Sequence, residues 1–318
     1  MTLEEIAATW AQPTSLRVPE WALGTVMRRS ITFATGVEDT ETRVFWVQAH
    51  GMTGDIRIHP ARPRIASEVK LASLDREALC LLASVEGGIA TTSWSEPVMS
   101  WANWIGFQTY DKYPEPGIMR RIGDCMIEFA PSGIYVEDWR FQPSAPGLLA
   151  GLRLELEEDE DGIDRPRAGG LVVAGDHAIR VLARREDLPE CMRAQDFVRE
   201  SADPVAALTQ VFDCITDYLV REGELWRIEA STDPRREGLR VPLTGDLEAG
   251  RDTAVLWEAV NDMPGVRRRR WHIDSLEVCH TFTQATPAPA DRLEWLENEA
   301  DTLIQPIDNN KHRVARCA

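Results

Sequence analysis

Lysine is scarce and long apolar runs are absent in this sequence of 318 residues. Lysine occurs only at Lys70, Lys112 and Lys311, and 52 acidic residues outnumber 35 basic ones, for a formal net charge of −17. A chain this acidic repels phosphate backbones and anionic lipid surfaces, so we expect neither a nucleic acid nor a membrane as partner. No apolar run reaches the ~18 residues that a membrane-spanning helix needs.

The motifs that mark common cofactor and metal sites are also missing. The sequence has no C-x-x-C, H-E-x-x-H, G-x-G-x-x-G or G-x-S-x-G pattern, and its six cysteines are irregularly spaced. We therefore expect free or buried thiols, no metal and no organic cofactor. The first residues carry Glu4 and Glu5 where a secretory signal has cationic residues, which favours a cytoplasmic location.

Short runs rich in Val, Ile, Thr and aromatic residues dominate the rest of the chain. Polar turns, glycines and prolines separate them, and no strand–helix alternation occurs, which predicts antiparallel sheets. The expected strands cover 26–35, 41–48, 53–60, 87–94, 99–110, 122–130, 133–141, 148–157, 169–177, 178–184, 214–220, 223–230 and 269–283. Short helices are expected at 4–10, 74–85, 191–213 and 291–304.

This pattern predicts a mostly β protein of two antiparallel, lipocalin-like (calycin-type) β-barrels with a few short helices. The highly charged run 157–168 is interpreted as a hairpin tip or an inter-domain connector. We place the domain boundary there, with one barrel in residues 1–156 and a second in 157–318 that carries a helical C-terminal extension. The basic run Arg267–Arg270 is expected to pair with acidic groups of the chain itself or of a neighbouring subunit.

Several of the strand sequences resemble a known family. MRRSITF, ETRVFWVQ, TGDIRI, IYVEDWR, LVVAGDHAIRVLAR and LWRIEA are similar to strands of a small fungal family of two-barrel, lipocalin-like proteins, typified by a yeast casein-kinase-interacting protein. The resemblance covers roughly residues 26–232, and the extension after Ala230 departs from it. It implies paired lipocalin-type barrels. The family has no settled activity, so the resemblance informs the fold more than the function.

Strand alternation separates the polar and apolar side chains of the first barrel onto two faces. Asp55, Arg57 and His59 share one face, opposite Ile56 and Ile58. By the same alternation the polar faces of the other strands carry Arg28 and Ser30, Trp46 and Gln48, Met126 and Glu128, and Tyr135, Glu137 and Trp139. Two interpretations remain open: the polar face meets water, or it lines a ligand cavity while the apolar face is buried elsewhere.

If the polar face lines a cavity, five residues are catalytic candidates. His59 is the first candidate for a general acid or base, with the alternative that it only bonds to the backbone before Pro60. Glu128 and Glu137 form a second acid–base pair if their strands are neighbours. Arg57 and Tyr135 are candidates for stabilising negative charge that develops on a substrate.

Eleven tryptophans make the sequence rich in large aromatic side chains. Core packing is one explanation, and an aromatic-lined pocket is the other. The substrate-binding candidates are Trp46, Trp101, Trp104, Asp55 and Arg28, with Asp55 expected to pair with Arg57 or Arg28. Trp101 and Trp104 have opposite parity, so on an unbroken strand only one of them faces a cavity.

These features favour a cofactor-independent lyase, hydratase or isomerase that moves protons on a small aromatic or hydrophobic molecule. A non-catalytic, lipocalin-like small-molecule binding protein is the first alternative. A protein-interaction module, which would use the acidic surface and the apolar residues of Leu293–Leu303, is the second. A homo-oligomer is compatible with each of these functions.

Overall fold

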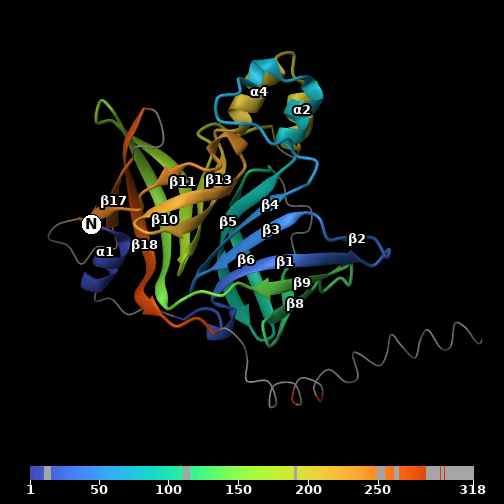
Figure 1. Ribbon diagram of the computed structural model, residues 1–318, viewed down its shortest axis with the longest axis vertical. Coiled ribbons are helices and arrows are strands. Elements are labelled where there is room, and N and C mark those ends of the chain that lie inside the picture. Colours follow the sequence, from blue (N-terminus) through green and yellow to red (C-terminus); the bar gives the residue numbers. More distant parts are fainter. Residues whose placement is uncertain are drawn as a thin grey trace, which may run out of the picture.

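The computed structural model describes residues 1–10, 16–109, 115–189, 192–248, 255–260 and 265–283, with Glu294 and Glu297 of the tail. The described residues form two antiparallel sheets of nine strands each, which lie side by side beneath a group of short helices (Figure 1). This confirms the expected mostly β architecture. The helix expected at 291–304 and the leucines of Leu293–Leu303 lie outside the described residues.

The first sheet closes into a barrel. Its strand order is β2-β1-β3-β4-β5-β6-β7-β8-β9, and pairing of β1 with β9 joins its ends. The strands are β1 (Gly24–Phe33), β2 (Glu38–Asp39), β3 (Arg43–Gln48), β4 (Met52–Ile58), β5 (Glu86–Ser95), β6 (Val98–Gly106), β7 (Gly117–Ile122), β8 (Cys125–Phe129) and β9 (Tyr135–Phe141). Closure gives every one of these strands except β2 an inner and an outer face.

The second sheet curls around its own hydrophobic cluster and is not closed by hydrogen bonds between β15 and β16. Its order is β15-β14-β13-β12-β11-β10-β18-β17-β16. The strands are β10 (Gly147–Asp159), β11 (Asp164–Ala174), β12 (His177–Leu182), β13 (Ile215–Glu222), β14 (Leu225–Ser231), β15 (Arg240–Val241), β16 (Gly245–Leu247), β17 (Val255–Ala259) and β18 (Val266–His280). The N-terminal helix α1 (Leu3–Thr9) packs Leu3 and Ile6 into this cluster.

The apolar faces of β3 and β4 pack against the second sheet. The rings of Phe45 and Tyr218 stack with centroids 4.2 Å apart, and Gly54 lies directly against Ile179. Ile56 is fully buried on the same face. Both faces of these strands are therefore buried. The apolar face forms the interface between the sheets, and the polar face points into the barrel.

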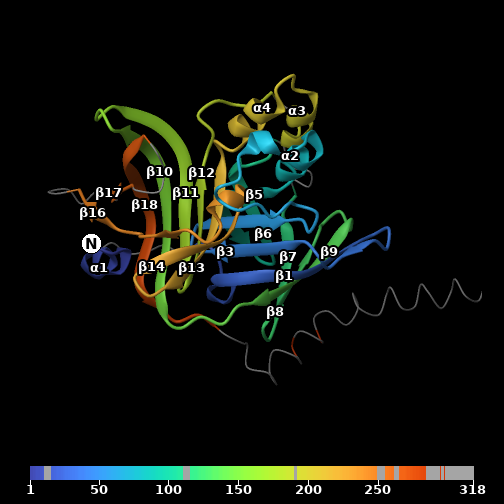
Figure 2. The ribbon, with the colours of Figure 1, turned by 45° about the horizontal axis from the view of Figure 1, so that its top comes forward.

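Three short helices form a cap over both sheets, seen at the top of Figure 2. Helix α2 (Arg76–Leu82) comes from the first half of the chain, and α3 (Ala194–Glu200) and α4 (Pro204–Val211) come from the second. Asp75 caps α2 by accepting from the Ala78 amide at 2.8 Å, and Asp203 caps α4, which begins with Pro204. Three 3₁₀ turns, η1 (Glu20–Ala22), η2 (Leu71–Ser73) and η3 (Pro234–Arg236), complete the elements.

The chain passes between the sheets earlier than the boundary expected after residue 156. The first sheet ends at Phe141 and the second begins at Gly147. The charged run 157–168 forms the far end of the β10–β11 hairpin, where Glu158 pairs with Asp164 around a turn at Gly162. The high charge density therefore belongs to a hairpin tip. The apolar strand before it, β10, is already part of the second sheet.

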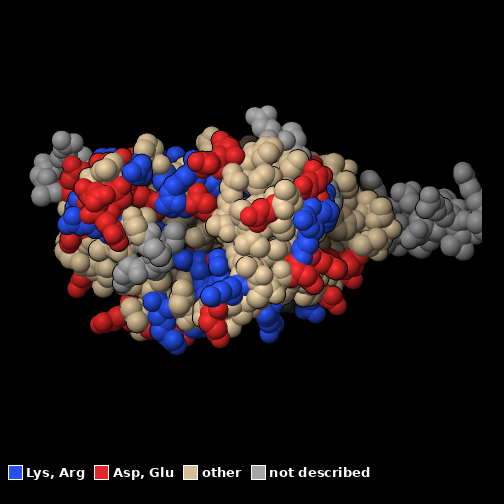
Figure 3. All heavy atoms as spheres, turned by 90° about the horizontal axis from the view of Figure 1, so that it is seen from above, with Lys and Arg blue, Asp and Glu red and all other residues tan. Residues whose placement is uncertain are grey.

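On the face seen in Figure 3, acidic and basic groups are interspersed. In the run Arg267–Arg270 each arginine pairs with acidic groups of the chain itself, as expected. Arg270 binds Glu155 at 2.6 Å, and Arg269 turns inward to Glu157 at 3.1 Å. Among the described residues, no helix combines the length and the apolar character needed to cross a membrane.

The close contact at Gly54 gives a test of the interface between the sheets. A Cβ at this position would lie 2.7 Å from Cγ2 of Ile179, so Gly54→Ala is expected to lower the free energy of unfolding by about 1–3 kcal/mol. The double variant G54A/I179A should lose less than the sum of the two single variants, because the shortened side chain makes room for the methyl group. Strict additivity in chemical denaturation would contradict the contact.

Candidate functional site

Strand register places most of the predicted polar residues inside the first barrel. Glu128 on β8 lies directly opposite Glu137 on β9. Trp139 is opposite Arg28 on β1, and Trp46 on β3 is opposite Asp55 on β4. Because cross-strand partners point to the same face, side chains far apart in the sequence converge on one interior cluster.

Glu128 is one of the two most buried acids of this cluster, with 4% of its surface exposed against 3% for Glu137. Its Oε1 accepts from the Tyr135 hydroxyl and its Oε2 from the Trp139 indole N–H, both at 3.2 Å. Burial, followed by the negative charge of Glu137, raises the pKa of Glu128 well above its usual value. Burial and the same two carboxyl groups also raise the pKa of Tyr135. Burial and the facing carboxyl group thus both favour the neutral form of Glu128.

Glu137 is the charged partner of Glu128, and we call the two residues the acid pair. The Arg28 guanidinium donates to Glu137 Oε1 at 2.7 Å and to Asp39 Oδ2 at 3.1 Å. The Glu128 and Glu137 side chains are also in hydrogen-bonding contact with each other. The Arg28 guanidinium thus hydrogen-bonds to Glu137, whereas the hydrogen bonds to the oxygens of Glu128 come from Tyr135 and Trp139.

Arg57 and Asp55 connect the acid pair to the barrel mouth. Arg57 Nε donates to Asp55 Oδ2 at 2.9 Å, and the Arg57 side chain is 36% exposed. Burial opposes the charge of Arg57, but the carboxylates of Asp55, Glu137 and Glu86 raise its pKa well above its usual value. Burial raises the pKa of Asp55 despite Arg57. A partly exposed arginine that keeps its positive charge thus lies close to the buried acids.

Three tryptophans form an aromatic wall beside these groups. The ring of Trp46 meets Trp139 edge-on at 5.2 Å and Trp101 at 5.8 Å between centroids. The Trp46 indole N–H donates to Gln48 Oε1 at 3.3 Å. These rings supply a rigid apolar surface next to the acid pair and Arg57.

Trp101 and Trp104 lie on the same side of the sheet, contrary to the parity expected for an unbroken strand. Strand β6 has a bulge opposite Ile89–Thr91, and Asn103 adopts φ 55°. The extra residue resets the alternation, so Trp101 reaches Trp46 and Trp104 lies over Gly88 and Gly106. A residue such as Asn that tolerates positive φ between two tryptophans is the only sequence signal of this break.

His59 does not join the cluster. Strand β4 ends at Ile58, and the exposed His59 ring accepts from the Ala61 amide at 3.1 Å through Nδ1. This local contact matches the alternative in which His59 bonds to nearby backbone. The strand ends because Pro60 follows, so the alternation that placed His59 with Asp55 and Arg57 no longer applies.

The second sheet contains a buried polar cluster that the sequence pattern did not predict. Asp217 on β13 lies at 3.0 Å from Arg180 and 2.9 Å from Arg236 and accepts from the Ser231 hydroxyl at 2.8 Å. The cluster continues through Glu258, whose carboxylate accepts from the Trp271 indole at 2.8 Å. Single charges flanked by apolar residues, as in AIRVL and CITDYLV, were the available signal. Because every acid here faces an arginine or an indole, we interpret the cluster as a structural element that stabilises the second sheet.

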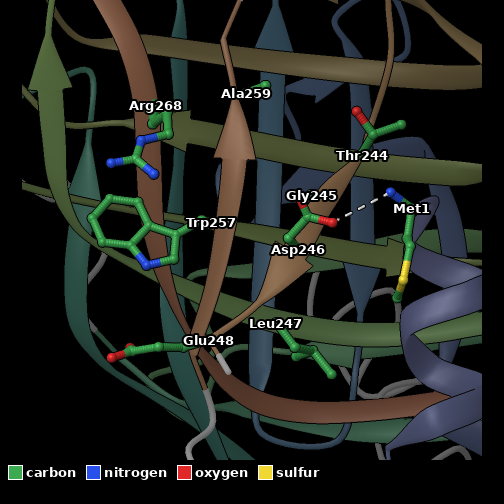
Figure 4. Close-up of a pocket in the computed structure, with 9 residues that line it drawn as sticks. All are labelled: Met1, Thr244, Gly245, Asp246, Leu247, Glu248, Trp257, Ala259 and Arg268. Carbon is green, nitrogen blue, oxygen red and sulfur yellow. Dashed lines mark ion pairs between the residues drawn. The ribbon is translucent and has the colours of Figure 1, made fainter. Parts of the chain in front are cut away.

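Two hollows of the described surface lie outside the first barrel. One of about 330 Å³ opens between the N-terminus and β16–β18 and is lined by Trp257, Arg268, Glu248 and Asp246 (Figure 4). A second of about 450 Å³ lies between α2 and α3, beside Cys80 and Arg199. Neither includes a predicted site residue. Among the described residues, no cluster of three or more His, Cys, Asp and Glu side chains is arranged to hold a metal ion.

Comparison with protein-family models, curated proteins and solved structures finds no match to this chain. The resemblance to the fungal two-barrel family therefore stays a prediction.

Proposed function

We propose that the first barrel is the acid–base site of an enzyme that moves protons on a small aromatic or hydrophobic molecule without a cofactor. The observation that carries this proposal is the acid pair, in which Glu128, whose pKa is raised by burial and by Glu137, lies opposite the arginine-bound Glu137. Burying two carboxyl groups face to face opposes folding. Environments that separate the proton affinities of two neighbouring acids are typical of sites that donate and accept protons.

Each member of the cluster has a role in this reaction. Glu128 donates a proton to a substrate carbon or oxygen and recovers it, and Glu137 assists as the conjugate base of the acid pair. Arg57 at the mouth stabilises negative charge that develops on the substrate, and Tyr135 holds the Glu128 carboxyl group in place. Trp46 and Trp101 contact one face of the substrate ring. The reaction class is a lyase, hydratase or isomerase.

A non-catalytic binding protein is the second candidate. It is favoured by the hydrogen bonds that already occupy both oxygens of Glu128, from Tyr135 and from Trp139. In a carrier these bonds would persist with the ligand bound. In an enzyme at least one of them gives way to the substrate.

The two candidates predict different fates for a retained compound. The protein is purified from its own host, and the small molecule that it carries is identified by native mass spectrometry and supplied to fresh protein. Glu128→Gln keeps the size of the side chain but has no acidic proton. We therefore expect turnover to fall at least about 100-fold while binding is retained. Unchanged turnover in E128Q would exclude Glu128 as the acid. Binding of the compound without its conversion by the unsubstituted protein would favour the carrier.

A further inference from the structure

The Trp104 indole of strand β6 lies against two glycines of the first barrel. Gly88 on β5 and Gly106 on β6 are cross-strand partners, and we call them the glycine notch. A Cβ on Gly88 would lie 2.5 Å from the Trp104 ring, and a Cβ on Gly106 would lie 2.2 Å from its Nε1. The indole thus fills the space that two side chains would otherwise take. Trp104 is nevertheless 43% exposed.

The glycine notch adjoins Asp55. Gly88 is the cross-strand partner of Asp55, so the ring that covers Gly88 lies on the same face as the Asp55 carboxylate. Asp55 Oδ2 accepts from Arg57. Its Oδ1 is shielded from solvent, and no donor among the described residues reaches it. A shielded carboxylate oxygen without a donor stands beside a half-exposed aromatic ring.

We propose that the glycine notch is the ring subsite of the first barrel, which the Trp104 indole fills until a ligand displaces it. The ligand class is a neutral planar aromatic molecule with a hydroxyl or N–H group that donates to Asp55 Oδ1. This inference rests on the proposed function, because it names the substrate class of the same barrel. A flat ring matches the slot left by two glycines, and a donor satisfies the shielded oxygen. Because Trp104 is partly exposed, its indole can rotate toward the solvent when a ligand enters.

Binding of three fluorinated probes tests the subsite by ligand-observed ¹⁹F NMR. 4-Fluorophenol offers a ring and a donor, 4-fluoroanisole offers the ring without a donor, and 4-fluorobenzoate offers an anion. We expect 4-fluorophenol to bind about tenfold more tightly than 4-fluoroanisole and more tightly than 4-fluorobenzoate, and Asp55→Ala to remove that preference. Equal binding of the phenol and the anisole, or preference for benzoate, would overturn the role of Asp55.

Two further variants separate a displaceable ring from a structural one. Trp104→Ala empties the notch, so 4-fluorophenol should bind more tightly than to the unsubstituted protein. Gly106→Ala places a methyl group in the notch and should abolish binding. Weaker binding in W104A would overturn the proposal, because an indole that only covers the glycines or stacks on the ligand gives that result.

The E128Q variant keeps this test independent of the proposed chemistry. E128Q changes neither the glycine notch nor Asp55, so it should bind 4-fluorophenol as the unsubstituted protein does. Retained binding in E128Q together with unimpaired turnover would remove the acid–base function and leave the subsite standing. Impaired turnover in E128Q with no phenol binding to any form would remove the subsite and leave the function standing.

Discussion

Asp217→Asn is expected to lower the free energy of unfolding by about 3–5 kcal/mol, because it leaves a buried ion cluster without its central charge. Asp217 has no exposed surface and lies within 3.0 Å of both Arg180 and Arg236. Asparagine keeps the shape and one acceptor but cannot neutralise two buried guanidinium groups. Chemical denaturation at neutral pH measures the loss. A loss below about 1 kcal/mol would contradict the central place of Asp217 in the second sheet.

The pH dependence of this loss follows from the direction of the pKa shift. Burial opposes the charge of Asp217, but Arg236 and Arg180 lower its pKa below the ordinary aspartate value. A lowered pKa in the folded state contributes stability above the unfolded-state pKa, and this contribution disappears as the pH falls through the folded pKa. The difference between D217N and the unsubstituted protein should be constant near neutrality and shrink below about pH 4.

A matched surface variant measures the effect of removing an ion-paired acid that is not buried. Glu222 pairs with Arg227 at 2.6 Å and with Arg240 at 2.9 Å, and all three side chains are partly exposed. Exposed pairs are screened by water, so Glu222→Gln should leave the unfolding midpoint nearly unchanged. Equal effects of E222Q and D217N would show that burial of the ion cluster does not matter.

The second large effect is expected at Glu128 and has the opposite pH dependence. The pKa of Glu128 is raised in the folded protein by burial and by Glu137, so the folded state holds a proton that the unfolded chain releases. Stability from this proton is fully present below the unfolded-state pKa and is lost as the pH rises through the folded pKa. Relative to Glu128→Gln, which does not titrate, the unsubstituted protein should lose up to about 1.4 kcal/mol per pH unit in that window.

Glu137→Gln is the matched control on the facing strand. It removes the charge that Arg28 binds at 2.7 Å, so it should destabilise the protein at neutral pH by about 1.5–3 kcal/mol. E128Q should instead equal or exceed the unsubstituted protein in stability at pH 8. Urea denaturation of the three proteins from pH 4 to pH 9 compares them directly. Identical pH profiles for E128Q and the unsubstituted protein would contradict a raised pKa at Glu128.

Much of the fold could be predicted from the sequence, because strand alternation and turn residues are local signals. The strands around Arg57, Glu128 and Glu137 are present as expected, and alternation correctly grouped the polar side chains. Alternation alone could not decide whether that group faced water. The answer depends on the second sheet, which covers the apolar face at Phe45 and Gly54 and so turns the polar face inward.

The parts that could not be predicted lie where the local rule breaks. The bulge at Asn103 resets the parity between Trp101 and Trp104, and Pro60 ends the strand before His59. Arg180 and Asp217 lie on different strands, and nothing local to either shows that they pair. The expected domain boundary at residue 156 differs from the observed passage between the sheets because a hairpin tip and a linker share the same charged composition.

The protonation state of Glu128 tests the central claim most directly. A difference infrared spectrum between the unsubstituted protein and E128Q at pH 7 isolates the vibrations of this one carboxyl group. We predict a carbonyl band of a protonated carboxylic acid that is lost in E128Q, and that shifts in D₂O. A spectrum with only carboxylate bands would contradict a neutral Glu128 and with it the acid–base site in the first barrel.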